Sequence, residues 1–285
     1  MRRMPEPVAG AQGAAVQLEV ERWRAGTRVH AFDRVAEEVP IALVYEDVPH
    51  GVMLATPADL EDFAVGFTLS EGLDERPEEI RGVAVHLAGE SIEIRLSVAW
   101  ERFTALLERR RRLTGRTGCG LCGVETAEQA VRALAPLTGG PTVSVRELHA
   151  AIAALGQRQP LNALTGSVHA AAWVRPGTGI ETVREDVGRH NALDKLIGAQ
   201  VRAGADFAGG FVLLTSRASF EMVQKCAAVG ISFLAALSAP TALAVRVARQ
   251  TGVTLIAFAR EQPHVVYAHA HRLREDCGDN RPSST

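Results

Sequence analysis

The first hundred residues alternate apolar and polar positions in several short runs. The period-two alternation predicts strands over residues 16–29, 41–55, 83–87 and 91–97. Between residues 57 and 73 the apolar positions recur at helical spacing, and acidic residues gather near the amino end, where the helix dipole favours them. We therefore expect an α+β domain over residues 16–112, preceded by a disordered Ala-, Gly- and Pro-rich stretch over residues 1–15.

From residue 141 the pattern changes to apolar runs that alternate with helical ones. The apolar runs predict strands over residues 168–174, 181–186, 211–215, 231–237 and 253–259. Gly204 is expected to end the first intervening helix, Ser219 to cap the second and Pro240 to start the third. Such strands indicate a layered α/β domain, over residues 141–272, whose sheet is covered on both faces. Residues 273–285 are expected to form a disordered tail.

Composition narrows the class of protein. The chain has 285 residues, of which 47% are hydrophobic, and a formal net charge of −2. This charge gives no reason to expect a nucleic acid or an anionic membrane as partner. The amino-terminal stretch lacks the apolar region of a secretory signal, and no apolar run approaches the roughly 20 residues of a membrane-spanning helix. We therefore expect a cytoplasmic protein.

Two thiols stand close together in a glycine-rich segment beside strong positive charge. The segment reads Cys119-Gly-Leu-Cys122-Gly, and it follows a predicted helix over residues 101–112 that ends in four arginines. Positive charge favours the thiolate, which attacks sulfur and binds metals. Residues 113–140 are expected to form a flexible loop and linker, since glycine on both sides of each cysteine gives the loop reach and little bulk. This setting favours a thiol that receives and delivers an atom, as in persulfide transfer.

Two other uses of the thiols remain open. A zinc site would need further ligands, for example His149 or His169, because no second close cysteine pair is evident. A thioredoxin-like redox pair normally opens a helix directly after a strand, whereas this pair follows a helix and a loop. Of the other two cysteines, Cys226 falls on the apolar face of a predicted helix and is expected to be an inert core residue.

A dense polar segment, residues 185–195, marks the junction between a predicted strand and a predicted helix. His190 and Asp194 are four residues apart, as are Asn191 and Lys195, so two polar pairs are expected side by side on about one helix face. This density indicates a site; the alternative is a capped helix with ordinary surface pairs.

Two further polar groups follow the ends of apolar strands. Arg217 stands where a strand gives way to a helix, at which free backbone amides and a guanidinium can receive phosphate or guanine. Residues 258–263 leave the carboxyl end of another strand, and ligands of open α/β sheets gather outside such ends. Together these groups outline a pocket for an anionic nucleotide.

The chain resembles the formate dehydrogenase accessory sulfurtransferase family over about residues 40–270. Four motifs in the family's order carry the resemblance: Thr117-Gly-Cys-Gly-Leu-Cys-Gly123, Glu185-Asp-Val-Gly-Arg-His-Asn-Ala-Leu-Asp-Lys195, Ser219-Phe-Glu-Met-Val-Gln-Lys225 and Ser238-Ala-Pro-Thr241. The sequence departs from the family pattern at Ser167, where a glycine is common, and at Val265, where asparagine is expected.

The resemblance implies a homodimeric sulfurtransferase. Such a carrier takes persulfide sulfur from a cysteine desulfurase and passes it to the molybdenum or tungsten bis-pterin guanine dinucleotide cofactor of formate dehydrogenase. Cys119 would carry the persulfide and Cys122 would assist. With the polar groups described above, the predicted cofactor-binding residues are Phe258, Ala259, Arg260, Glu261, Gln262, Pro263, Arg217, His190 and His169. No protein-bound zinc is expected. A noncatalytic cofactor-binding chaperone and a zinc-binding regulator are the alternatives.

The resemblance also implies a second domain with the cytidine deaminase-like fold, but the residues of deaminase chemistry are missing. Zinc deaminases use a His-x-Glu motif and a later Pro-Cys-x-x-Cys motif. Here the counterparts read His190-Asn-Ala192 and Ser216-Arg-Ala-Ser219, without the glutamate or the cysteines. Hydrolytic deamination is therefore not expected, because a shared fold does not carry an activity with it.

Overall fold

The computed structural model describes residues 13–73, 76–99, 103, 132–260 and 263–275. Its amino-terminal part holds a four-stranded sheet in the order β4-β3-β6-β5, formed by β3 (Val39–Tyr45), β4 (Val48–Ala55), β5 (Ile80–Ala88) and β6 (Ser91–Val98). The helix α1 (Leu60–Ser70) packs on one face of this sheet, where Ile41, Leu43 and Phe63 are fully buried. A short 3-10 turn, η1 (Pro77–Glu79), leads into β5. The predicted helix and the strands predicted over residues 83–87 and 91–97 are confirmed. The single run predicted over residues 41–55 is instead two antiparallel strands, β3 and β4, joined by a turn at Glu46 and Asp47.

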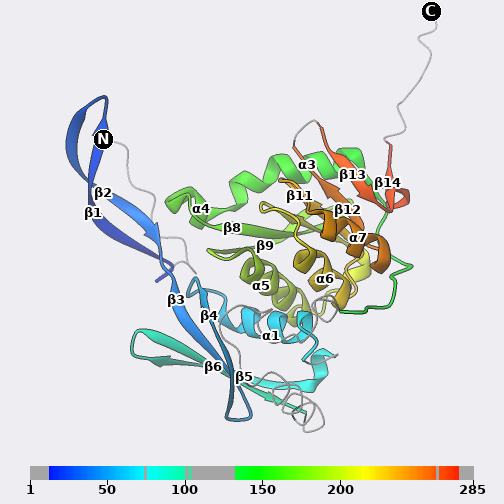
Figure 1. Cartoon of the computed structure of the whole chain (residues 1–285), viewed down its shortest axis with the longest axis horizontal. Coiled ribbons are helices and arrows are strands. Elements are labelled where there is room, and N and C mark those ends of the chain that lie inside the picture. Colours follow the sequence, from blue (N-terminus) through cyan, green and yellow to red (C-terminus); the bar gives the residue numbers. More distant parts are fainter. Residues whose placement is uncertain (1–12, 74–75, 100–102, 104–131, 261–262, 276–285) are drawn as a thin grey trace, which may run out of the picture.

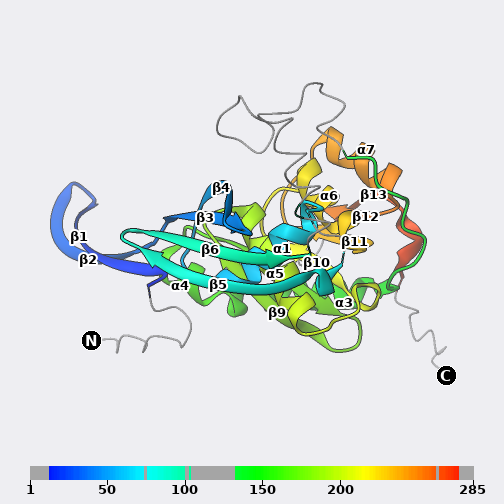
Figure 2. The ribbon, with the colours of Figure 1, turned by 90° about the horizontal axis from the view of Figure 1, so that it is seen from below.

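A two-stranded antiparallel ribbon precedes this sheet. It consists of β1 (Ala15–Arg24) and β2 (Thr27–Ala36), joined by a turn at Ala25 and Gly26, both of which have positive φ. We call this ribbon the arm. It projects away from the rest of the molecule (Figures 1 and 2). The single predicted run over residues 16–29 thus spans a hairpin turn, which the sequence prediction missed.

A six-stranded mixed sheet dominates the carboxyl-terminal part. Its order is β13-β12-β11-β10-β8-β9, with β8 (His169–Arg175), β9 (Gly179–Asp186), β10 (Phe211–Leu214), β11 (Phe233–Ala236), β12 (Thr254–Ala257) and β13 (Val265–Ala268). The central strands β10, β11 and β12 are parallel, whereas β8, β9 and β13 are antiparallel to their neighbours. The carboxyl ends of the parallel strands therefore share one edge with the start of β8 and the end of β9.

Helices cover both faces of this sheet, as predicted (Figure 1). On one face lie α5 (Arg189–Arg202), α6 (Phe220–Ala228) and α7 (Ala242–Thr251), whose apolar residues share a core with the strands. On the other lies α3 (Val145–Leu155). The remaining elements are α4 (Pro160–Thr165), η3 (Gly156–Arg158), η4 (Phe207–Gly209), η5 (Ala270–Arg272), and the small ladder of β7 (Val143–Ser144) with β14 (Leu273–Arg274).

Several sequence expectations stay predictions or need correction. Gly204 follows the end of α5 with a φ of +66°, as expected of a glycine that ends a helix. Ser219 occupies the amino-terminal cap position of α6, but its side chain makes no capping hydrogen bond and contacts Glu221 instead. The predicted helix over residues 101–112 lies outside the described residues apart from Phe103. The fold is mixed α/β; the finer likeness to cytidine deaminases stays a prediction.

The two parts of the molecule meet where α1 crosses α5 without side chains between the backbones. A Cβ added at Gly66 would collide with the carbonyl of Asp194, and one added at Gly198 would collide with that of Asp62. Only glycine allows this approach at the two positions. Within the described residues, no helix is long and apolar enough to cross a membrane.

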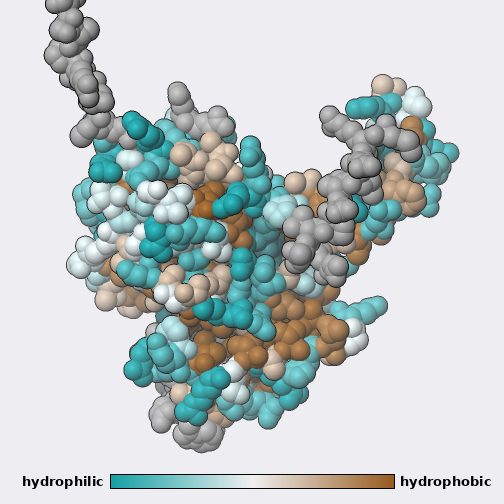
Figure 3. All heavy atoms as spheres, turned by 180° about the vertical axis from the view of Figure 1, so that it is seen from behind, coloured by the Kyte–Doolittle hydropathy of each residue, from teal (hydrophilic) through white to brown (hydrophobic). Residues whose placement is uncertain are grey.

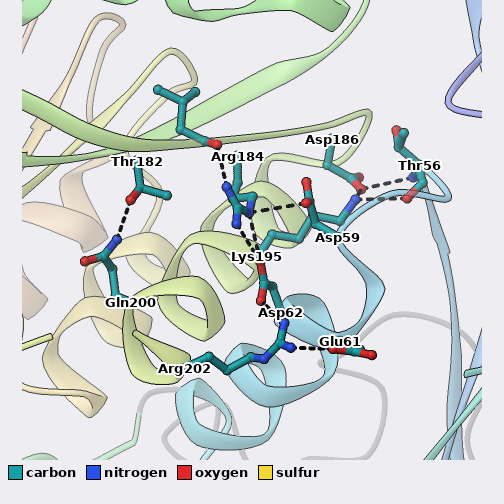
Figure 4. Close-up of polar contacts among 11 residues, drawn as sticks. Thr56, Asp59, Glu61, Asp62, Thr182, Arg184, Asp186, Lys195, Gln200 and Arg202 are labelled. Atoms are coloured by element: carbon teal, nitrogen blue, oxygen red, sulfur yellow. Dashed lines mark hydrogen bonds and ion pairs between the residues drawn. The ribbon is translucent and has the colours of Figure 1, made fainter. Parts of the chain in front are cut away.

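Ion pairs flank the crossing of α1 and α5, which we call the joint (Figure 4). The carboxylate of Asp62 receives hydrogen bonds from the Nε of Arg184 at 2.9 Å and from the Nη1 of Arg202 at 2.6 Å. Asp62 is buried, and the hydrogen bond to its carboxylate raises the pKa of Arg202 although burial opposes this. The joint thus combines backbone contact with buried charge and holds α5 against α1.

Candidate functional site

A depression of about 490 Å³ lies at the carboxyl edge of the parallel strands. The residues that follow β10, β11 and β12 line one side of it, and α3 with the turn after it lines the other; these residues include Thr215, Ser238, Ala259 and Arg260. Open α/β sheets bind ligands in this position because the strand ends leave a crevice between the connecting loops. Two residues of the predicted loop, Ala259 and Arg260, therefore line this depression.

The part of the predicted loop within the described residues has an unusual backbone. Phe258 has a φ of +51°, and its side chain is 41% exposed, whereas Ala259 is fully buried. A positive φ is strained for an aromatic residue, and such strain gathers at functional sites. The turn is closed by the amide of Arg260, which donates to the carbonyl of Pro263 at 3.2 Å. Glu261 and Gln262, also predicted to bind cofactor, lie outside the described residues.

A histidine pair connects this loop to α3. The Nε2 of His149 and the Nδ1 of His264, the residue directly after Pro263, lie 3.1 Å apart. One imidazole donates and the other accepts, so at least one ring is neutral while the bond is formed. Burial, together with the nearby His149, lowers the pKa of His264. The contact holds the end of the loop against the wall of the depression.

On the α5 side of the same edge, His190 pairs with a carboxylate from the next helix. The Nε2 of His190 lies 2.8 Å from the Oε2 of Glu221, which also accepts from the hydroxyl of Ser219 at 3.1 Å. The hydrogen bond from His190 holds the pKa of Glu221 below its ordinary value, against the opposing effect of burial. Glu221 therefore stays ionised and orients the imidazole.

Arg189 adds a guanidinium to this group. Its Nη2 lies 4.0 Å from the Oε2 of Glu221, and its Nε is buried without a hydrogen-bond partner among the described residues. A buried, unpartnered N–H is costly unless a ligand or water accepts from it. Arg189 belongs to the motif of residues 185–195 but was not among the predicted site residues. The strand-to-helix junction was the available signal, because the first residue of such a helix faces the sheet edge.

His169 and Arg217 complete the basic surface of the edge. His169 starts β8 opposite Asp186. Burial lowers the pKa of His169, and Arg189 and His190 lower it further, whereas Asp186 opposes the shift. Arg217 follows β10 and is exposed, with no ion pair among the described residues. We call Arg189, His190, His169 and Arg217 the basic cluster.

The predicted pairing within residues 185–195 is wrong. His190 contacts Glu221 rather than Asp194, and Asn191 donates to Asp186 at 3.0 Å rather than meeting Lys195. The reason is burial. Asp194 and Lys195 face the joint, where each meets a partner from another element, and only the first residues of α5 reach the open edge.

Asp194 and Lys195 make two separate buried ion pairs. Lys195 is fully buried with its Nζ 2.7 Å from Asp186 and 2.9 Å from the carbonyl of Thr56. The Nζ of Lys225 lies 3.0 Å from Asp194 and 2.6 Å from Glu71. Burial disfavours the charged form of Lys225, but the two carboxylates outweigh burial and raise its pKa. These groups are structural, and both pairs connect the amino-terminal part to the sheet domain.

Cys119 and Cys122 lie outside the described residues, but both flanks of their segment are described. Phe103 is buried in the amino-terminal core. Arg132 donates from its amide to Gln224 of α6 at 2.7 Å and from its Nη1 to the carbonyl of Ser70 at 2.8 Å. Cys226 is fully buried, and burial raises the pKa of its thiol, which confirms that it is an inert core residue.

Comparisons with known proteins agree with one another. The model of the FdhD/NarQ family matches residues 36–274. The chain is 52% identical over 257 residues to the sulfur carrier protein FdhD of Cupriavidus necator, covering 90% of this chain and 89% of that protein. It is 50% identical over 259 residues to the sulfur carrier protein FdhD of Xanthomonas euvesicatoria, covering 91% and 92%.

A solved structure agrees as well. A putative formate dehydrogenase accessory protein from Desulfotalea psychrophila superimposes with a TM-score of 0.72 at 25% identity, covering 92% of this chain and all of that one. The family match spans well over half of the chain and includes the basic cluster, the depression and the cysteine pair. The chain belongs to the FdhD/NarQ family.

Proposed function

We propose that the chain is a sulfur carrier that serves formate dehydrogenase, with Cys119 as the persulfide-bearing residue. The observation that carries the proposal is the sequence identity of 52% and 50%, over about nine tenths of the chain, to relatives named sulfur carrier protein FdhD. The structural neighbour is in turn described as a formate dehydrogenase accessory protein. The donor is a cysteine desulfurase, and the acceptor is the molybdenum or tungsten bis-pterin guanine dinucleotide cofactor. The carrier works in the cytoplasm as a homodimer.

The sulfur atom is transferred in two steps. In loading, the thiolate of Cys119 attacks the outer sulfur of the desulfurase persulfide; a new S–S bond forms, the donor's S–S bond breaks, and the donor cysteine leaves as a thiolate. In delivery, an electron-pair donor on the acceptor attacks the outer sulfur now on Cys119, and Cys119 leaves with the bonding electrons. Cys122 assists this release. Neither step needs a metal bound by the carrier.

The sheet edge offers the groups that a guanine dinucleotide requires. Phosphate groups carry charge that guanidinium forks bind bidentately, and Arg189 and Arg217 supply two such forks. The buried Nε of Arg189 is a donor without a partner among the described residues. An exposed aromatic ring can stack on a purine, and Phe258 presents one directly before Ala259, which lines the depression. We propose that the phosphates lie at the basic cluster and the guanine at the depression, beside residues 258–263.

Chain length allows Cys119 and Cys122 to reach this edge. Cys122 precedes Arg132 by ten positions, which corresponds to at most about 33–36 Å of extended chain. Arg132 is fixed to Gln224, and Glu221 stands three residues earlier on the same helix, less than one turn away. The anchor of the cysteine segment thus lies close to the basic cluster, which supports delivery to a cofactor held there.

Mass spectrometry tests the thiol chemistry. After incubation with a cysteine desulfurase and cysteine, the wild type should gain about 32 Da per transferred sulfur. Cys119→Ala should lose this adduct, whereas Cys226→Ala, which removes a buried thiol, should retain it. A wild type without any adduct contradicts the proposal. If the double variant Cys119→Ala/Cys122→Ala still supports active formate dehydrogenase, the chain is a noncatalytic cofactor chaperone instead.

Calorimetry with GDP tests the pocket independently of sulfur. GDP carries the guanine and the pyrophosphate that the proposal assigns to the edge, and it needs no metal centre. Binding by the wild type that Arg217→Ala weakens would support the assignment. Absence of binding would remove the guanine pocket from the proposal while leaving the persulfide step untouched.

A further inference from the structure

The exposed apolar side chains of the described residues are concentrated in the amino-terminal part. Of eleven large apolar residues that are exposed, nine lie on its strands, and the other two are Phe258 and Val265. Five belong to the arm: Leu18, Trp23, Val29, Phe32 and Val35. The register places Trp23 and Phe32 on one face of the ribbon and Leu18, Val29 and Val35 on the other. Several exposed apolar side chains on one small element mark an interaction site, whereas single exposed apolar residues are ordinary.

The arm has almost no cover from the other described residues of its chain. None of its twenty residues is buried, and only its base, at Ala15 and Ala36, packs beside Leu161 of α4. An isolated two-stranded ribbon is at best marginally stable in water. Trp23 and Phe32 are the most exposed of its apolar residues, at 66% and 67%. Phe32 lies directly opposite Glu19 in the ribbon, so their side chains share a face. Glu19 and Trp23 are four residues apart in one strand and also share a face, so Trp23 and Phe32 stand on the same side of the ribbon.

A second uncovered apolar surface lies next to the arm. Val52 and Leu54 of β4 are 67% and 55% exposed. They pair with Ala42 and Pro40 of β3, on the face of the sheet opposite α1. Figure 3 shows apolar side chains gathered over the amino-terminal part below the arm. We call this surface, residues 40, 42, 52 and 54, the acceptor face.

The arm cannot cover the acceptor face of its own chain. Only Glu37 and Glu38 separate β2 from β3, and two residues are too few to fold a ten-residue ribbon back over the strand that follows it. The arm instead continues outward from the sheet (Figure 2). Arm and acceptor face are therefore two uncovered apolar surfaces, carried by one chain, that only separate molecules can bring together.

We propose that in the homodimer the arm of each chain lies across the acceptor face of a second copy, with Trp23 and Phe32 inward. The proposal rests on the homodimer of the proposed function and assigns its contact surface. In such a dimer each arm contacts the acceptor face of the other chain, and a two-fold axis relates the two contacts. Both surfaces of both chains are then occupied, so no further chain can add and no filament forms. Aromatic side chains in such a contact supply most of the binding energy.

The area of the contact fits a stable dimer. Ten residues at about 3.4 Å each, in two strands about 4.8 Å apart, make a ribbon face of roughly 34 by 10 Å. If the whole face of each arm were covered by an equal area of the partner, two arms would bury at most about 1,400 Å² in total, against a standard interface size of about 1,600 Å². The four residues of the acceptor face supply only part of that area, and the partner surface beside them supplies the rest. Two arms stacked only on each other would bury about half of that area. The exchange therefore explains the exposed surfaces better than arm-to-arm stacking.

Sedimentation of the full chain across the micromolar range tests the assignment. We expect a dimer for the wild type and at least a tenfold weaker dimer for Phe32→Glu and for Val52→Glu, with melting temperatures that show intact folding. Leu87→Glu is the matched control, because Leu87 is 83% exposed on the opposite edge strand β5; it should leave the dimer unchanged. A wild type that stays monomeric overturns the proposal and the homodimer. A dimer insensitive to Phe32→Glu and Val52→Glu overturns only the arm contact.

Cross-linking distinguishes exchange from arm-to-arm stacking. In a background with Cys119, Cys122 and Cys277 changed to serine, chains carrying Phe32→Cys are mixed with chains carrying Val52→Cys and oxidised. The exchange predicts a disulfide-linked dimer in the mixture and little in either variant alone. Equal cross-linking of Phe32→Cys chains with themselves would overturn the exchange. Neither measurement uses a sulfur donor, so a failure of sulfur transfer leaves both results valid.

Discussion

The two ends of one eleven-residue segment, residues 185–195, differ sharply in what surrounds them. At the open edge, Arg189 and His190 are about one third exposed and contact Glu221 at the start of α6. One turn further along α5, Asp194 and Lys195 are buried and form ion pairs at the joint. The same density of polar residues therefore supplies a candidate binding cluster at one end and a structural connection at the other.

Burial determines which of these polar side chains stabilise the fold and which remain available to a ligand. A buried charge without a partner costs several kcal/mol, so each such group at the joint requires a fixed counter-charge and cannot be changed alone. Charges at the edge keep access to water and remain available to a ligand. Substitutions at the joint should therefore change stability, and substitutions at the edge should change binding.

The largest effect is expected from Lys225→Met at the joint. The substitution leaves Asp194 buried beside Glu71 without a cation, which should lower the free energy of unfolding by about 3–5 kcal/mol. Urea denaturation followed by circular dichroism measures the change. The double variant Lys225→Met/Asp194→Leu removes both charges and should recover much of the loss. Equal instability of the single and double variants would show that packing, rather than unpaired charge, dominates.

Gly198→Ala should also destabilise the joint, by about 1–3 kcal/mol, because its Cβ meets the backbone carbonyl of Asp62 and forces α1 away from α5. Gly156→Ala is the matched control. Gly156 also follows helical backbone, but a Cβ there meets nothing within 4 Å, so the variant should change stability by less than about 1 kcal/mol. If both variants unfold at the same urea concentration, the close approach of the helices contributes nothing.

At the edge, Arg189→Ala should leave stability nearly unchanged and weaken GDP binding. A charge-assisted hydrogen bond is worth about 1.5–3 kcal/mol, which corresponds to roughly 10- to 150-fold in affinity. Calorimetry with GDP and urea denaturation of the same preparations separate the two effects. Arg175→Ala, which removes an arginine paired with Glu181 away from the edge, should change neither. Loss of stability without loss of binding would assign Arg189 to the fold.

Sequence patterns predicted the helices and strands well where a segment is buried on one face or on all sides. The strands β10 to β12 were recognisable as short continuous apolar runs, and α5 was recognisable from its apolar stripe at helical spacing. The hairpin turn at Ala25 was missed because the alternation of β1 continues into β2 with little interruption. The pairing of residues 190–195 was predicted wrongly, because the partners Glu221, Lys225 and Asp186 reach α5 from other elements. Spacing along one helix carries no information on what packs against it.

The smallest effect is expected from acid on the pairing of Glu221 with His190. The hydrogen bond from His190 depresses the folded-state pKa of Glu221, so the stability it contributes is fully present above the unfolded pKa of about 4.3 and is lost as the pH falls through the lower folded value. Glu221→Gln should therefore be less stable than the wild type at pH 7, by less than about 1 kcal/mol for this partly exposed pair. The gap should narrow below pH 4. Urea denaturation at pH 7, 5 and 3 measures it, with Glu181→Gln as the control for loss of one carboxylate. A gap that persists unchanged at pH 3 would mean that the glutamine disturbs packing at the start of α6, and the carboxylate would then have no electrostatic role in orienting His190.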